Sequence, residues 1–89
     1  MNVDMVLNEI RKKCEAHNAS EIILFGSRAK GTSLERSDID IAVSGVSDIE
    51  SLRGEIEQIP TLYTIDLVDM DTCANMLLIE DIRKYGHKI

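Results

Sequence analysis

The stretch ILFGSRAKGTSLERSDIDIAV, residues 23–43, decides the fold of this chain. It joins an apolar, β-branched run at residues 21–25 to a second such run at residues 38–43, which contains Asp38 and Asp40. Runs of this length and composition predict buried strands. Because side chains alternate along a strand, both aspartates are predicted on one face, with Cα atoms roughly 6.5–7 Å apart. Two acids therefore occupy positions at which a buried strand favours isoleucine and valine.

Outside this stretch, helical and strand periodicities alternate along the chain. Apolar side chains recur at helical spacing in three segments, which predict helices over residues 2–17, over residues 47–59 and in a last segment carrying Met76, Leu77, Ile79 and Ile82. A two-residue alternation predicts a third strand over residues 63–70, with Asp66 and Val68 on the face opposite to Ile65 and Leu67. The basic residues 83–89 are expected to fray.

Helix ends are indicated by capping residues. Ser47 is the predicted N-cap of the second long helix, with Glu50 completing a capping box, and Pro60 ends that helix. Asp71 or Thr72 is predicted to cap the last helix.

The predicted order is α-β-α-β-α-β-α, which is typical of a small α/β (α+β) fold. Residues 26–31, which begin and end with glycine, fit a turn plus a short helix, and residues 32–37 fit a polar loop. We predict a three-stranded mixed β-sheet with helices covering one face. The length of 89 residues is sufficient for one domain, so residues 1–89 are expected to form a single unit.

Composition restricts the function. The net charge of -6 disfavours broad nucleic-acid binding, because phosphate contacts need basic side chains. There is no secretory signal and no apolar run long enough to span a membrane, so we expect a cytoplasmic protein without membrane contact. Cys14 and Cys73 occupy apolar positions of predicted helices and are expected to be buried thiols.

The aspartates are candidate metal ligands. Asp38 and Asp40 repel each other, and a divalent cation such as Mg²⁺ would relieve that repulsion. Asp66 supplies a third acid from the third strand. Asp69 and Asp71 are rivals for that role, but Asp69 alternates to the other face and Asp71 lies beyond the strand. Taken alone, an Asp-x-Asp pair on a strand is more often a solvated face than a metal site.

Gly26 and Ser27 favour a functional site over a solvated face as the explanation of the aspartates. A strand-to-helix turn directs backbone N–H groups at an anion, and glycine permits close approach. Arg28 and Lys30 lie beside it, where they could pair with a triphosphate or with surface acids. A P-loop is disfavoured, because no lysine follows the second glycine of the pattern. A phosphate-binding turn and a cluster of acids, taken together, suit the binding of a nucleoside triphosphate with Mg²⁺.

The combination of Gly26-Ser27, ten further residues and then Asp38-x-Asp40 resembles the signature of the polymerase-β-like nucleotidyltransferases. The motif GSRAKG, residues 26–31, is similar to that of the minimal nucleotidyltransferases (MNT). The resemblance implies that Asp38, Asp40 and Asp66 are catalytic and bind two Mg²⁺ ions. It implies that Gly26 and Ser27 hold the β- and γ-phosphates of ATP. The implied reaction is attack on the α-phosphorus and transfer of AMP.

The resemblance also implies a partner. Larger relatives carry a second helical domain that this chain is not expected to supply, and minimal members are commonly paired with an all-helical HEPN toxin. The implied function is an antitoxin that adenylylates a hydroxyl of that partner. The alternative is a non-catalytic antitoxin that neutralises its partner by binding alone. His17 and His87 are expected to have solvated or capping roles rather than acid–base ones.

Overall fold

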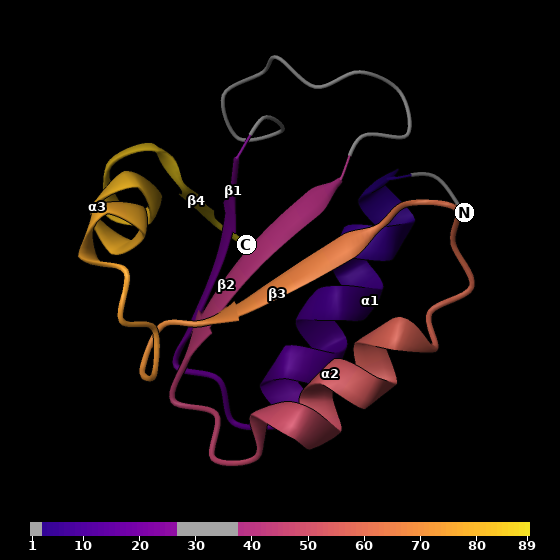
Figure 1. The fold of residues 1–89 in the computed structure, drawn as a ribbon. Coiled ribbons are helices and arrows are strands. Elements are labelled where there is room, and N and C mark those ends of the chain that lie inside the picture. The colour runs from indigo at the N-terminus through magenta and orange to yellow at the C-terminus, as the bar shows by residue number, and fades with distance from the viewer. Residues whose placement is uncertain (1–2, 27–37) are drawn as a thin grey trace.

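The structure is a computed structural model, and it describes residues 3–26 and 38–89. Its elements, drawn in Figure 1, are α1 (Val3–Ala16), β1 (Glu21–Phe25), β2 (Ile39–Ser44), α2 (Ile49–Glu57), β3 (Ile65–Asp69), α3 (Met76–Tyr85) and β4 (His87–Lys88). β1 has the predicted bounds, and the ends of α1, β2, α2 and β3 differ from prediction by one or two residues. The predicted short helix after Gly26 and the loop at 32–37 lie outside the described residues. No helix of the described ranges has the length and apolarity needed to cross a membrane.

The strands form a mixed sheet in the order β3-β2-β1-β4. β1 pairs antiparallel with β2 on one side and with β4 on the other, whereas β2 and β3 are parallel and are joined through α2. The prediction of a mixed sheet is confirmed. The predicted strand number is wrong, because the sheet formed by the described residues has 4 strands.

The additional strand comes from the segment that was expected to fray. His87 pairs with Leu24 and Lys88 with Ile23, and the backbone N–H of Ile89 donates to the carbonyl of Ile22 at 3.0 Å. Two exposed polar residues have no periodicity of their own. Their strand exists because α3 returns the chain to the free edge of β1.

Helices cover both faces of the sheet, so the prediction of a single covered face is also wrong. On one face, α1 and α2 pack against a larger core that includes Ile39, Ile41 and Val43 of β2. On the other, Ile82 of α3 packs against a smaller core that includes Ala42. Figure 1 shows α3 on the side of the sheet opposite to α1 and α2. The alternation predicted for β2 is therefore confirmed, with each set of side chains in its own core.

Two helix caps differ from prediction. Asp48 rather than Ser47 caps α2, and its carboxylate accepts from Ser51 N at 3.1 Å. Asn75 caps α3 in the same way, accepting from Leu78 N at 3.1 Å. Several neighbouring residues before each helix carry a side-chain oxygen that can accept from the free N–H groups of the first turn. The sequence alone does not show which of them is the N-cap.

The late start of α3 determines which of its side chains are buried. Met76 and Leu77 lie in the first turn and are 66% and 79% exposed. Ile79 and Ile82, together with Leu78, pack into the smaller core. Half of the predicted apolar face of this helix is therefore exposed to solvent.

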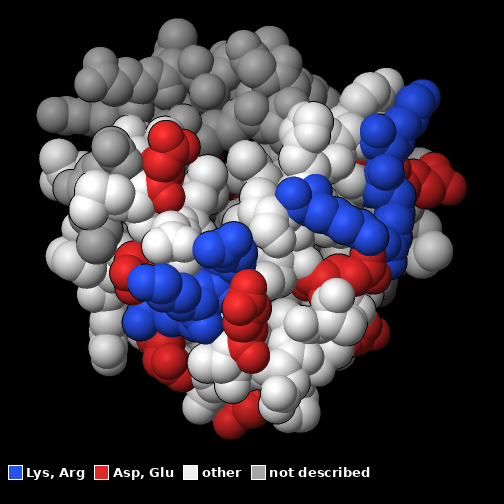
Figure 2. Space-filling model, turned by 180° about the vertical axis from the view of Figure 1, so that it is seen from behind, with Lys and Arg blue, Asp and Glu red and all other residues white. Residues whose placement is uncertain are grey.

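Glu21 attaches α3 and β4 to β1. Its carboxylate accepts from Arg83 Nη1 at 2.6 Å and lies 3.8 Å from Lys88 Nζ. The hydrogen bond from Arg83 lowers the pKa of Glu21. Figure 2, the view from behind, shows Lys and Arg side chains lying among Asp and Glu side chains.

Gly86 lies tightly against β1 at the end of α3. A Cβ placed on Gly86 would lie 2.4 Å from Ile23 Cγ2 and 2.4 Å from the Ile82 carbonyl oxygen. We therefore expect Gly86→Ala to lower the free energy of unfolding by about 1–3 kcal/mol, as overpacking of a core does. Urea unfolding measures this change.

Gly54 provides the matched control, because a Cβ there would have no atom within 4 Å. Gly54→Ala in α2 is expected to raise the free energy of unfolding by about 1 kcal/mol through helix propensity. Equal stability of Gly86→Ala and the wild type would show that α3 is not held against β1 as described.

Candidate active site

Asp40 and Asp66 are direct neighbours on adjacent strands. They form an in-register pair between β2 and β3. Ile39 and Ile41 on either side of Asp40 face the larger core, so Asp40 projects from the face that α3 partly covers. Asp66 lies on the same face as Val68, as predicted. The sheet therefore places the two side chains next to each other, on strands that lie roughly 4.8 Å apart.

Gly26 lies against the Asp40 carboxylate. It follows Phe25, which pairs with Asp40 across β1 and β2, and it has a φ of 79°. A Cβ on Gly26 would lie 2.2 Å from Asp40 Oδ2. Both the backbone conformation and the close approach require glycine here. The described group beside the Gly26 backbone is the carboxylate of Asp40, and the approach of a phosphate to Gly26 stays a prediction.

The surroundings of Asp40 disfavour its negative charge. Burial raises the pKa of Asp40, and the charges of Asp66 and Asp38 and a hydrogen bond with Asp66 raise it further. Asp40 is half-buried, whereas Asp38 and Asp66 are exposed. Asp38 and Asp66 are thus close enough to disfavour the charge of Asp40, which is the electrostatic condition that a bound cation would relieve.

The donor set suits a hard cation, since it consists of carboxylate oxygens around a half-buried acid. Across residues 3–26 and 38–89, no three or more His, Cys, Asp and Glu side chains are arranged as a metal site. Convergence of Asp38, Asp40 and Asp66 on shared ions therefore stays a prediction.

The rival acids have other contacts at the far end of the strands, where Asp69 pairs with Val43. Asp69 Oδ1 accepts from Asp71 N at 3.0 Å. Asp71 accepts from Gly45 N at 2.7 Å and from Ser44 Oγ at 2.8 Å. These bonds, led by the one from Gly45, lower the pKa of Asp71. Both acids stabilise the turn after β3.

The remaining predicted site residues, Ser27, Arg28 and Lys30, lie outside the described residues. The structure therefore describes the part of the candidate site that β1, β2 and β3 form. Of the predicted phosphate-binding turn it describes only Gly26.

Other residues considered from the sequence lie away from the acids. His17 Nε2 contacts Glu55 Oε2 and connects the end of α1 with α2, on the opposite side of the sheet. Cys14 is buried as predicted, and burial raises the pKa of its thiol to about 11. Cys73 does not occupy the predicted buried helix position, because it is partly exposed in the connection before α3.

The pockets lined by described residues include two that were not predicted. The first, which we call the β3 pocket, has a volume of about 290 Å³ and lies between the end of α2 and the start of β3. It is lined by Ile56, Glu57, Ile59, Thr61, Tyr63, Thr64 and Ile65. Its residues span a helix end, an irregular connection and a strand start, so no periodicity identifies them as a group.

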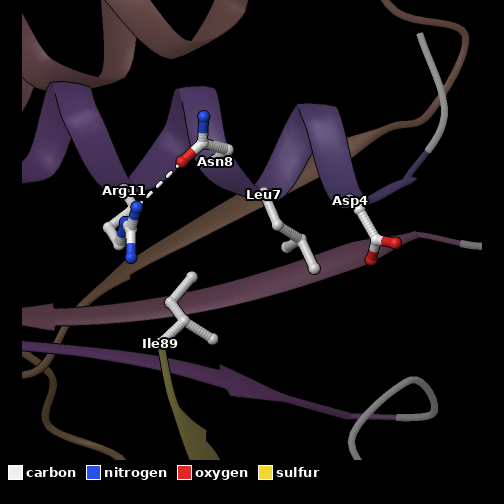
Figure 3. A pocket seen from close by; sticks show the side chains of 5 residues that line it. All are labelled: Asp4, Leu7, Asn8, Arg11 and Ile89. Atoms are coloured by element: carbon white, nitrogen blue, oxygen red, sulfur yellow. Dashed lines mark hydrogen bonds between the residues drawn. The ribbon is translucent and has the colours of Figure 1, made fainter.

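The second, which we call the α1 pocket, has a volume of about 240 Å³ and is lined by Asp4, Leu7, Asn8, Arg11 and Ile89. Figure 3 shows Leu7 and Ile89 on its two sides and the hydrogen bond from Arg11 Nη2 to Asn8 Oδ1, which is 2.9 Å long. It lies beside β4, at the edge of the sheet opposite to β3.

A sheet with paired acids on neighbouring strands beside a glycine turn is the arrangement expected of a nucleotidyltransferase. The profile of the family described as "Polymerase beta, Nucleotidyltransferase" matches residues 8–89. The chain therefore belongs to the polymerase β nucleotidyltransferase family, as the sequence motif predicted.

Solved structures that are similar to this chain include two toxin–antitoxin structures. One, described as a toxin–antitoxin with AMP-PNP, is 27% identical with a TM-score of 0.68 and covers 91% of this chain and 69% of its own. The other, the toxin–antitoxin MntA-HpeT, is 28% identical with a TM-score of 0.71 and the same coverages of 91% and 69%. It is a mutant in which two aspartates, separated by one residue, are replaced by glutamate. No curated protein matches this chain.

Proposed function

We propose that this protein is a Mg²⁺-dependent nucleotidyltransferase that transfers AMP from ATP to a hydroxyl of a partner protein. In this proposal it is the antitoxin of a pair whose toxin is an all-helical HEPN protein. The observation that carries the proposal is the in-register pair of Asp40 and Asp66 beside Gly26. A like-charged pair in which one member is half-buried is costly for a fold and is expected where a site needs it.

Asp38, Asp40 and Asp66 would hold the metal. When bound, Mg²⁺ would neutralise charge at the reacting phosphate and stabilise the negative charge on the attacking and leaving oxygens. The protein's contribution is placement, since β2 and β3 fix two carboxylates on neighbouring strands. Asp40 is the inner ligand and Asp66 the exposed one, so an acceptor hydroxyl from solvent reaches Asp66 more readily.

The nucleotide is proposed to bind along the acids toward β1. Gly26 leaves room beside Asp40, and Ser27 with Arg28 and Lys30 would contact the triphosphate. Two features of the similar structures support this assignment. One holds AMP-PNP, an adenine nucleotide. The other changes two aspartates with the spacing of Asp38 and Asp40.

The partner follows from the same comparison and from charge. Both similar structures are toxin–antitoxin complexes, which supports a protein partner that this chain silences. The net charge of -6 favours a protein acceptor over free nucleic acid.

The position of a radioactive label in ATP tests the reaction. The partner, taken as the protein encoded by the neighbouring gene, is incubated with this chain, Mg²⁺ and ATP labelled on either the α- or the γ-phosphate. We expect label on the partner only from the α position, because AMP transfer releases the other two phosphates as pyrophosphate. EDTA should abolish the transfer. A partner that is silenced without acquiring label would favour the non-catalytic binding antitoxin.

A further inference from the structure

We propose that the flank of α3 that faces the acid pair docks the segment of the partner protein that carries the acceptor hydroxyl. This flank holds Leu77, Asp81 and Tyr85, which we call the α3 stripe. The inference rests on the proposed function for the reaction and for the existence of a partner. It adds the surface to which the partner binds. It also adds the chemistry of the docked segment, which is an apolar side chain next to the hydroxyl.

The acid pair and α3 lie close together on the same face of the sheet. Phe25 pairs with Asp40 across β1 and β2, and Phe25 is buried in the smaller core together with Ile82 of α3. Ala42, two residues after Asp40, belongs to the same core. Successive side chains on one face of a strand are roughly 6.5–7 Å apart. The core under α3 therefore begins within about one such step of the acid pair.

The acceptor must approach over the face that carries α3. The other face is covered by α1 and α2, and Asp40 and Asp66 do not project from it. Of the described helices, α3 is the one on the acid face, as Figure 1 shows. A helix with its side chains is roughly 10–12 Å wide, so α3 projects well above the sheet beside the acids. A partner side chain that reaches Asp66 therefore passes along the flank of α3 that faces the acids.

Topology and one ion pair identify that flank. α3 joins β3 to β4, which are the two edges of the sheet, so the helix crosses the strands and has one flank toward each of their ends. Asp40 lies at the end of the sheet where β1 ends, whereas Glu21 lies at the other end, where β1 begins. Arg83 donates to Glu21 at 2.6 Å. The flank that carries Arg83 thus faces away from the acids, and the opposite flank faces them.

The α3 stripe is on the opposite flank. With 3.6 residues per turn, Leu77, Asp81 and Tyr85 lie roughly 120°, 160° and 200° around the helix from Arg83. Their spacing of four residues places them in one line along the helix. Met76, by the same geometry, lies only about 20° from Arg83. Met76 and Leu77 are thus neighbours in the chain that point toward opposite ends of the sheet.

Exposed apolar surface is concentrated on this helix. Five large apolar residues of the described chain are exposed, and three of them belong to α3. In the stripe, Leu77 is 79% exposed and Tyr85 is 45% exposed. Leu78, the next residue to Leu77, is half-buried against the smaller core. Apolar side chains grouped at the border of a site are typical of a surface that contacts another protein.

A protein segment fits the α3 stripe better than the nucleotide does. Asp81 lies in the middle of the stripe, and its carboxylate would repel a phosphate group. The triphosphate is proposed to lie at Gly26, on the β1 side of the acids. Leu77 and Tyr85 offer apolar contact on either side of Asp81 along the helix. An apolar side chain of the partner, next to its acceptor hydroxyl, would fill that contact while the hydroxyl reaches the acid pair.

Two neighbouring residues of α3 allow a matched test. Leu77→Ser removes the proposed contact, and Met76→Ser removes an apolar side chain that is 66% exposed on the other flank. The dissociation constants of the neighbouring-gene protein and of AMP-PNP with Mg²⁺ are measured for both variants. We expect Leu77→Ser to raise the partner's dissociation constant about tenfold or more, as loss of an apolar contact in an interface does. Met76→Ser should leave it nearly unchanged, and neither variant should change the binding of AMP-PNP.

Photo-crosslinking tests the same contact without depending on its strength. A benzophenone side chain is placed at position 77 or at position 76, and the complex with the neighbouring-gene protein is irradiated. Mass spectrometry then identifies the joined peptides. We expect position 77 to crosslink to the partner peptide that acquires AMP or to one next to it, and position 76 to crosslink little.

The outcomes separate this inference from its alternatives. Unchanged partner affinity in Leu77→Ser, with no crosslink from position 77, would overturn the proposal. Equal losses of affinity in Leu77→Ser and Met76→Ser would also contradict it, because the acid-facing flank would have no special role. Weaker binding of AMP-PNP in Leu77→Ser, with unchanged partner affinity, would assign the α3 stripe to the nucleotide.

The proposed function can fail separately from this inference. Absence of any transferred α-label with the wild type would refute AMP transfer. The affinity and crosslinking measurements need no catalysis, so they would still show whether the partner contacts the α3 stripe.

Discussion

Asp40→Asn is expected to lower AMP transfer by at least about a hundredfold, because metal-ion catalysis supplies several kcal/mol of charge stabilisation. Asparagine keeps the size of the side chain but removes the charge that would hold the ion. The initial rate of label transfer from α-labelled ATP measures the loss, at saturating Mg²⁺. Transfer at the wild-type rate would remove Asp40 from the active site.

The same substitution is expected to preserve or raise the stability of the metal-free protein. The pKa of Asp40 is raised in the fold, so the folded chain binds this proton more tightly than the unfolded chain does. The free energy of unfolding therefore falls as the pH rises from the ordinary pKa of an aspartate through the raised one. At neutral pH, Asp40→Asn should be as stable as the wild type or more stable. Urea unfolding in EDTA across this pH range measures both curves.

Asp71→Asn is the matched control, because the pKa of Asp71 is shifted in the opposite direction to that of Asp40. Hydrogen bonds from Gly45 and Ser44 lower the pKa of Asp71, so its charge stabilises the fold. That contribution is present above the unfolded pKa and is lost as the pH falls through the folded one. Asp71→Asn should lower stability at neutral pH and leave AMP transfer nearly unchanged. A gain in stability for Asp71→Asn and a loss for Asp40→Asn would contradict the described surroundings of both acids.

Gly26→Ala is expected to reduce both stability and transfer. A φ of 79° is left-handed, and this conformation costs a non-glycine residue about 1–2 kcal/mol. In addition, the new Cβ would lie 2.2 Å from Asp40 Oδ2, so the carboxylate must move from its position beside Asp66. Transfer should therefore fall to near the level of Asp40→Asn.

A double-mutant cycle separates the two causes. Asp40→Ala removes the clashing oxygen, so Gly26→Ala should cost less stability in that background than in the wild type. The difference, measured by urea unfolding, is the clash, and the remainder is the backbone conformation. Additive losses would show that Gly26 and Asp40 do not contact each other.

The sequence predicted the part of the fold that local periodicity controls. β1 and β2 were identified from β-branched runs, and the two-residue alternation placed Asp40 and Ala42 opposite to Ile41. The same alternation in β3 placed Asp66 with Asp40. These predictions need only the geometry of one strand at a time.

What depends on distant contacts was missed. β4 is two exposed residues long, and its pairing with β1 requires α3 to cross the sheet first. The burial of α3 was misjudged because Asn75, rather than Asp71 or Thr72, begins the helix. The β3 pocket combines Ile56 and Ile59 with residues of an irregular connection, and no repeat in the sequence relates them.

The pairing pattern also bears on the order in which the domain assembles. β2, α2 and β3 are contiguous in the chain, so Asp40 and Asp66 meet through a compact local unit. The contact of Leu24 with His87 instead closes a loop over most of the chain, which carries a larger entropic cost. Because synthesis proceeds from the N-terminus, the acid pair is available while β1 still has a free edge. A chain in which Asp40 and Asp66 are already paired therefore exposes the edge of β1 until β4 pairs with it.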